Sequence, residues 1–134
     1  MFGKKATPQK RIDALIGAGT AVRGDIVFEG GLRIDGQVVG NVTAAEGKPA
    51  TLVVSEQARI EGRVEVSHVV INGQVHGPVH AEYLELQPKA RITGDVAYKS
   101  IEMHVGAVVQ GRLDPGSAEP GSAAVVELKR GGKA

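Results

Sequence analysis

The sequence of 134 residues contains no cysteine and no tryptophan, and aromatic side chains make up only 3% of it. Without cysteine the chain can form neither a disulfide framework nor a thiolate metal site, so an oxidising compartment is not indicated. A core of this size commonly relies on a few large rings, and here it must be built from Val, Ile, Leu and Ala. Together with 19 glycines, this composition is typical of short β-strands joined by turns.

Long apolar runs are also missing from the sequence. No segment approaches the ~18 consecutive apolar residues that a membrane-spanning helix needs, and the N-terminal residues lack the apolar centre of a secretory signal. The net charge is +1, but the basic side chains Lys4, Lys5, Lys10 and Arg11 concentrate positive charge in the N-terminal tail. The charge therefore indicates no basic face on a folded domain.

One short phrase, apolar–x–Gly–x–apolar, recurs along the chain. It reads ARIEGRV at 58–64, ARITGDV at 90–96 and AVVQGRL at 107–113, and LRIDGQV at 32–38 and TAVRGDI at 20–26 follow the same outline. Except for the phrase at 20–26, each of these is preceded by another apolar–x–apolar element and a bend that contains turn residues. This alternation predicts short strands with one buried face.

Aligning the rows on Gly62, Gly77, Gly94 and Gly111 gives spacings of 15, 17 and 17 residues, with the second row two residues short at its bend. A fifth row fits upstream, from Ile26 through Gly36 to Val38. Units of ~16–17 residues cannot fold alone and must stack on one another. The sequence therefore predicts an all-β fold, a parallel β-helix of roughly six rungs about 25–30 Å long.

Three segments follow from this interpretation. We expect a flexible basic tail at 1–13, a β-helix at 14–113 with rungs from about Val22 onward, and a disordered Pro/Gly/Ser/Ala tail at 114–134. Residues 43–51 interrupt the register as an extra loop. Pro78 is expected at a corner, because proline donates no hydrogen bond to a strand ladder.

Little in the sequence indicates chemistry. His76 and His80 would lie ~13 Å apart on one strand, too far to share a zinc ion unless the chain turns sharply between them, and His104 falls at a bend. Gly47-Lys48 lacks the neighbours of a phosphate-binding loop, and no serine has the setting of a nucleophile. We expect no catalytic residue, cofactor, metal, nucleotide or nucleic acid.

The N-terminal tail offers a possible membrane contact. Phe2, Lys4 and Lys5 could bind an anionic membrane surface, since each basic residue contributes ~1 kcal/mol there and a buried phenylalanine contributes ~1.5–3 kcal/mol. One copy would bind weakly and many copies on a polymer would bind well. The alternative is an ordinary solubilising terminus.

A β-helix also has two ends, each with unpaired backbone groups and apolar side chains. Soluble solenoids usually cover these ends with a polar cap or a helix, and the sequence contains no amphipathic helix of useful length. Uncovered ends are expected to pair with other ends. If the axes are colinear the result is a filament that needs no nucleotide.

The chain resembles the bactofilins, bacterial polymer-forming cytoskeletal proteins. The resemblance rests on the start Met1, Phe2, Lys4, Lys5, on the IDGxVxGxV phrase at 34–42 and on the ARIxGxV units, and it covers about residues 1–113. It implies a right-handed, triangular β-helix that forms nonpolar filaments without nucleotide. It also implies a cytoplasmic protein, peripheral on the inner face of the cytoplasmic membrane, that positions peptidoglycan-remodelling enzymes in cell-shape control.

The resemblance further implies hydrophobic contacts between the ends of the rod. Carried onto this chain, the polymerisation residues are Val22 and Ile26 at the N-terminal end and Met103, Val109 and Leu113 at the C-terminal end. Family members often carry a phenylalanine in the last rung, and this chain does not. Its membrane-binding residues would be those of the basic tail named above.

Two other functions remain open from the residues. A left-handed β-helix enzyme, either a hexapeptide-repeat acyltransferase or a zinc carbonic anhydrase, would show a six-residue period and 18 residues per turn. The period here is nearer 17 and the six-residue repeat is absent. An interaction module that remains monomeric is the third possibility.

Overall fold

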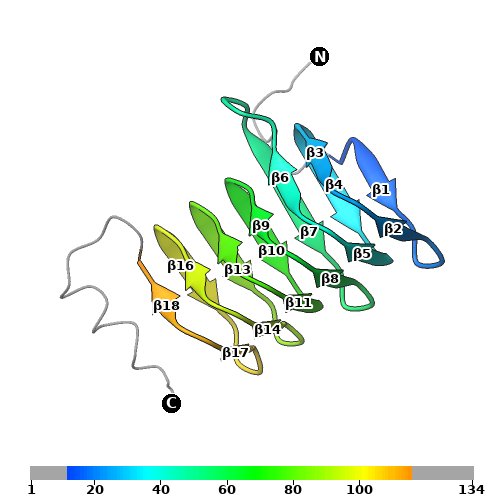
Figure 1. Ribbon diagram of the computed structural model, residues 1–134. Helices are drawn as coiled ribbons and strands as arrows, with labels where there is room; N and C mark the ends of the chain where they lie inside the picture. The colour runs from blue at the N-terminus through cyan, green and yellow to red at the C-terminus, as the bar shows by residue number, and fades with distance from the viewer. Residues whose placement is uncertain (1–11, 116–134) are drawn as a thin grey trace.

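The computed structural model describes residues 12–115, which form 18 short strands and no helix. The strands belong to three parallel six-stranded sheets. The chain visits the three sheets in turn and then steps to the next rung, so the strands stack as a rod from β1 to β18 (Figure 1). None of the described residues forms a helix long and apolar enough to cross a membrane.

The first sheet supplies the opening strand of every rung. Its strands are β1 (Ala14–Ile16), β4 (Gly30–Ile34), β7 (Ala50–Val54), β10 (His68–Ile71), β13 (Tyr83–Leu86) and β16 (Ser100–Met103). The second sheet contains β2 (Ala21–Arg23), β5 (Gln37–Val39), β8 (Arg59–Glu61), β11 (Gln74–His76), β14 (Arg91–Thr93) and β17 (Val108–Gln110). The third contains β3 (Ile26–Phe28), β6 (Val42–Ala44), β9 (Val64–Glu65), β12 (Val79–His80), β15 (Val96–Ala97) and β18 (Leu113–Asp114).

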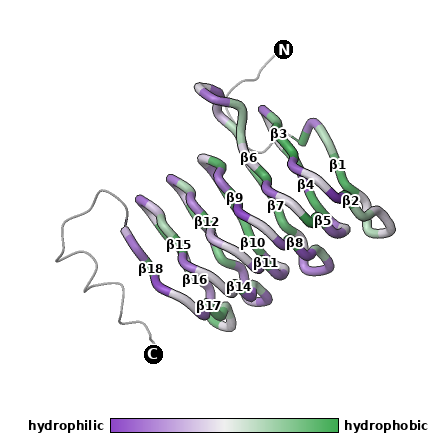
Figure 2. Tube along the Cα trace, in the orientation of Figure 1, coloured by the Kyte–Doolittle hydropathy of each residue, from purple (hydrophilic) through white to green (hydrophobic). Residues whose placement is uncertain are grey.

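A single aliphatic core lies between the three sheets. Inward residues stack in columns from rung to rung, as Val54, Ile71 and Leu86 do in the first sheet, and all three are fully buried. Apolar and hydrophilic stretches alternate along the rungs (Figure 2). The predicted all-β solenoid of about six rungs is confirmed, and three sheets around one core give it a triangular section. Its handedness stays a prediction.

The recurring glycine of the sequence phrase marks one corner of the rod, between the second and third sheets. We call this column the glycine corner; its members have φ between +133° and +157° and are Gly24, Gly40, Gly62, Gly77, Gly94 and Gly111. A Cβ added to any of the last five would lie 2.0–2.5 Å from the carbonyl oxygen of the glycine one rung before. Only glycine satisfies both the backbone conformation and this close stacking.

The residue after each glycine continues the corner. The Asp25 side chain accepts a hydrogen bond from the backbone N–H of Asn41, and the Asn41 side chain accepts one from Arg63, each at 3.0 Å. Pro78 occupies the same position in a later rung, between β11 and β12, so its predicted place at a corner is confirmed. With no N–H, proline leaves no donor to be satisfied there.

The fifth row of the sequence alignment is wrong in register. It placed Gly36 opposite Gly62, but Ile34 pairs with Val54 in the first sheet and Gly40 is the glycine that stacks on Gly62. The phrase LRIDGQV therefore starts one sheet earlier than ARITGDV does.

A tight bend explains this error. Asp35 and Gly36 join β4 to β5 in the same way that Asn72 and Gly73 join β10 to β11. The bend at Asn72 and Gly73 is the one that the alignment predicts to be two residues short. A Cβ on Gly36 would lie 2.2 Å from the backbone oxygen of Thr20, so this glycine is required by a different close approach.

Hydrogen bonds from Arg33, and then from Ser55, hold the pKa of Asp35 below its ordinary value.

Two boundaries also differ from expectation. The first rung starts at β1, before Val22, because Ala14–Ile16 pairs with β4. The interruption predicted at 43–51 is confined to 45–49, since Thr43 and Ala44 pair with β3 in strand β6. The solenoid extends to Asp114 in β18, and the predicted tails lie almost entirely outside the described residues.

Candidate polymerisation surfaces

Among the described strands, each end of the rod has three that pair with a neighbour on one side only. The first-rung strands β1, β2 and β3 pair only with β4, β5 and β6, and the last-rung strands β16, β17 and β18 pair only with the rung before them. Within residues 12–115 no helix lies over either edge (Figure 1). In this part of the chain the outer edges of the terminal rungs resemble the edge strands of an open sheet, which can template pairing with another strand.

The N-terminal end exposes apolar side chains that would be core residues in any other rung. Val22 and Ile26 are partly buried, whereas the residues that pair with them one rung later, Val38 and Val42, are fully buried. The missing neighbour on one side accounts for the difference. We call these inward side chains the N-terminal face: Ile16, Val22, Ile26 and Phe28.

The C-terminal end repeats this arrangement. Met103 is 42% exposed, while its in-register neighbour Leu86 is fully buried. Val109 follows the buried Ile92 in the same way. We call the inward side chains of the last rung the C-terminal face: Ile101, Met103, Ala107, Val109 and Leu113.

All five residues expected at the polymerisation contacts lie in the terminal rungs. Their role in assembly stays a prediction. The sequence interpretation missed Ile16, Phe28, Ile101 and Ala107, and the first two were missed because β1 was not recognised and the upstream row was shifted. Phe2, Lys4 and Lys5 lie outside the described residues.

The histidines singled out in the sequence are not brought together. His76 ends β11 in the second sheet and His80 ends β12 in the third, with the glycine corner between them. His76 Nε2 lies 3.3 Å from the side-chain oxygen of Gln74. Neither histidine belongs to the group of potential metal ligands that the described part of the chain contains, which includes His104 instead.

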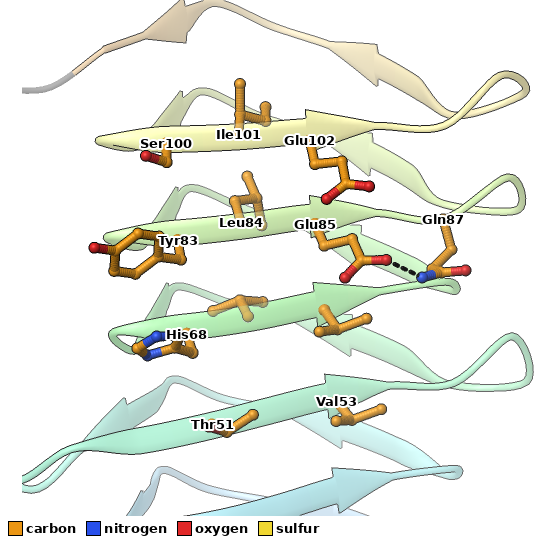
Figure 3. Close-up of a pocket in the computed structure, with 12 residues that line it drawn as sticks. Thr51, Val53, His68, Tyr83, Leu84, Glu85, Gln87, Ser100, Ile101 and Glu102 are labelled. Atoms are coloured by element: carbon orange, nitrogen blue, oxygen red, sulfur yellow. Dashed lines mark hydrogen bonds between the residues drawn. The ribbon is translucent and has the colours of Figure 1, made fainter. Parts of the chain in front are cut away.

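A hollow of about 710 Å³ lies on the outer face of the first sheet (Figure 3). At one side the rings of His68 and Tyr83 stack with centroids 4.8 Å apart. At the other side the carboxylates of Glu85 and Glu102 project from neighbouring strands.

Residues 12–115 thus define a repeat protein of the parallel β-solenoid class, with partly exposed apolar side chains in its two terminal rungs. Residues 14–114 match the family model described as "Bactofilin: Polymer-forming cytoskeletal". The chain belongs to the bactofilin family. No curated protein and no solved structure gave a significant match. Membership of a polymer-forming family implies self-association and favours the cytoskeletal interpretation over the hexapeptide-repeat enzymes.

Proposed function

We propose that this protein is a cytoskeletal scaffold that assembles end to end into nonpolar filaments without nucleotide. The observation that carries the proposal is the pair of terminal rungs: within residues 12–115 their three outer strand edges pair with no other strand, and their inward apolar side chains are partly exposed. Family membership supports self-association.

The interior of the rod supports assembly without an energy source. Each internal rung is held by strand hydrogen bonds and by stacked aliphatic side chains, and a junction between two ends would use the same two kinds of interaction. Burial of apolar surface contributes ~25 cal/mol per Å². Such a contact forms spontaneously once this gain exceeds the cost of association, so no nucleotide hydrolysis is needed.

The scaffold would act on the inner face of the cytoplasmic membrane. Phe2, Lys4 and Lys5 supply an apolar anchor and positive charge, and polymerisation would join many weak anchors into one stable attachment. A filament held there could position peptidoglycan-remodelling enzymes in cell-shape control. The family resemblance motivates this part of the proposal.

The purified full-length chain is expected to form filaments in buffer that contains EDTA and no nucleotide. Negative-stain electron microscopy tests this directly, and analytical sedimentation gives the mass distribution at the same concentration. A single small species at micromolar concentration would contradict the proposal and favour the monomeric interaction module.

Deletion of residues 2–5 is expected to abolish binding to anionic vesicles while filaments persist, because the deletion removes Phe2, Lys4 and Lys5 and leaves the terminal rungs intact. Co-sedimentation with phosphatidylglycerol vesicles measures the bound fraction, and neutral vesicles show the contribution of charge. Deletion of residues 131–134 is the matched control and should leave binding unchanged. Equal binding by both deletions would remove the membrane part of the proposal.

A further inference from the structure

Two carboxylates face the solvent side by side on the outer surface of the first sheet. Glu85 in β13 and Glu102 in β16 are in-register neighbours on adjacent rungs. In Figure 3 their side chains project from the same side of the sheet at the edge of the hollow. Like charges placed directly opposite each other destabilise a strand pair, so this position calls for a compensating cation.

His104 lies against both carboxylates. Its Nε2 atom is 3.1 Å from Glu85 Oε2 and 3.4 Å from Glu102 Oε2. The backbone of His104 is fixed by hydrogen bonds on both sides: its N–H donates to the oxygen of Leu86 at 2.9 Å, and its own oxygen accepts from Ala107 at 3.1 Å. These backbone hydrogen bonds fix the position from which the His104 side chain extends toward the two carboxylates.

These distances suit a metal ion. One ligand atom from each of the three residues lies within 4.8 Å of the other two. In a tetrahedral zinc site with bonds of ~2.0–2.2 Å, neighbouring ligand atoms are roughly 3.4 Å apart. The two contacts of His104 are already near that separation, so an ion could enter with small side-chain movements.

The surroundings complete the arrangement. The amide nitrogen of Gln87 donates a hydrogen bond to Glu85 Oε2, which orients this carboxylate as second-layer partners do at metal sites. Among residues 12–115, the ion pairs of Glu85 and Glu102 are both with His104, so no lysine or arginine neutralises them. The neighbouring hollow leaves room for water molecules on the ion.

We propose that Glu85, Glu102 and His104 form a binding site for a first-row divalent transition metal of the zinc type. An imidazole nitrogen with two carboxylate oxygens suits such an ion better than Mg²⁺ or Ca²⁺, which prefer ligand sets made of oxygen. Three protein ligands leave at least one position for water. The site lies on the outer surface of the first sheet at the last two rungs, beside the C-terminal face, and all three of its residues come from one chain.

Isothermal titration of the untagged full-length chain with zinc chloride, after removal of EDTA, is expected to show one ion per chain. H104A should weaken this binding at least tenfold, and Glu85→Gln should weaken it while preserving the shape of the side chain. H76A is the matched control, since His76 is an outer-face histidine that makes no ion pair with a carboxylate among residues 12–115, and this variant should bind zinc as the unmodified chain does. Circular dichroism establishes that each variant is folded.

A second measurement uses the unmodified chain. Zinc is expected to protect His104 from carbethoxylation by diethyl pyrocarbonate, as read by mass spectrometry, while His68, His76 and His80 react as before. Equal zinc affinity in the H104A and H76A variants, equal protection of all four histidines, or no binding at submillimolar zinc would each overturn the proposal.

Discussion

Replacement of Gly62 by alanine is expected to lower the free energy of unfolding by about 3–5 kcal/mol, a large part of the ~5–15 kcal/mol that stabilises a typical domain. The φ angle of +150° is unfavourable for a residue with a Cβ. The new Cβ would also lie 2.1 Å from the oxygen of Gly40 and 2.6 Å from its carbon. These are backbone atoms held within the stack, so they cannot move aside as a flexible side chain could.

Two other glycines separate these effects. Gly47 has a φ of +76° and nothing within 4 Å of an added Cβ, so its alanine variant should show the conformational cost alone, about 1–2 kcal/mol. Gly17 has nothing within 4 Å of an added Cβ and is not among the glycines with a positive φ, so its alanine variant should be near neutral. Guanidinium unfolding followed by circular dichroism, at one protein concentration because assembly adds to apparent stability, measures the series. A Gly62 variant that unfolds at the Gly17 midpoint would refute the close-stacking account.

Replacement of Val109 by arginine is expected to reduce filaments to particles no larger than a dimer. Val109 points into the last rung and is partly buried, so the guanidinium would occupy the C-terminal face and lose hydration at any junction formed there. Burial of an unpaired charge costs several kcal/mol. In a nonpolar filament each face meets its own kind, so an intact N-terminal face would still allow a dimer. Leu113→Arg should behave in the same way.

The matched control is Val108→Arg, on the same strand with its side chain outward and 39% exposed. It adds the same charge to the same rung without touching the face, and filaments should persist. Sedimentation velocity and electron microscopy compare the two variants, and circular dichroism verifies the fold of each. Filaments of normal length from Val109→Arg would mean that the C-terminal face is not a junction.

The sequence was sufficient for the solenoid because alternation and glycine spacing reflect local geometry. It failed in the upstream row because IDG at 34–36 and IEG at 60–62 have nearly the same letters in different places, the first at a two-residue bend and the second at the glycine corner. Strand β1 was missed because the upstream row was aligned on Gly36, so the phrase TAVRGDI at 20–26 and the preceding Ala14–Ile16 were not placed in a row of their own. Its partner in register, Leu32–Ile34, becomes evident only when that row is placed correctly.

The candidate functional residues could likewise be predicted only in part. The inward positions of the last rung could be predicted, because a repeat that stops leaves its final apolar side chains uncovered. The contact of His104 with Glu85 could not be predicted, since the two residues are 19 positions apart and meet through the bend after β16. Glu85 and Glu102 occupy the same middle position in successive rows of the repeat. This shared position could have predicted that the two carboxylates are neighbours.

Every strand pair between the described rungs is parallel, so the chain circulates around the rod in one sense from β1 to β18. If the N-terminal end of a second rod contacted the C-terminal end of the first, both chains would circulate in the same sense. The strands at that junction would then pair in parallel, as they do between rungs. A rod turned end for end circulates in the opposite sense, so its edge strands would run antiparallel to those they meet. The hydrogen bonds of an antiparallel pair alternate between closely and widely spaced pairs, whereas those of a parallel pair are evenly spaced. The hydrogen-bond pattern at a junction therefore shows whether the two subunits of a filament point in the same or in opposite directions.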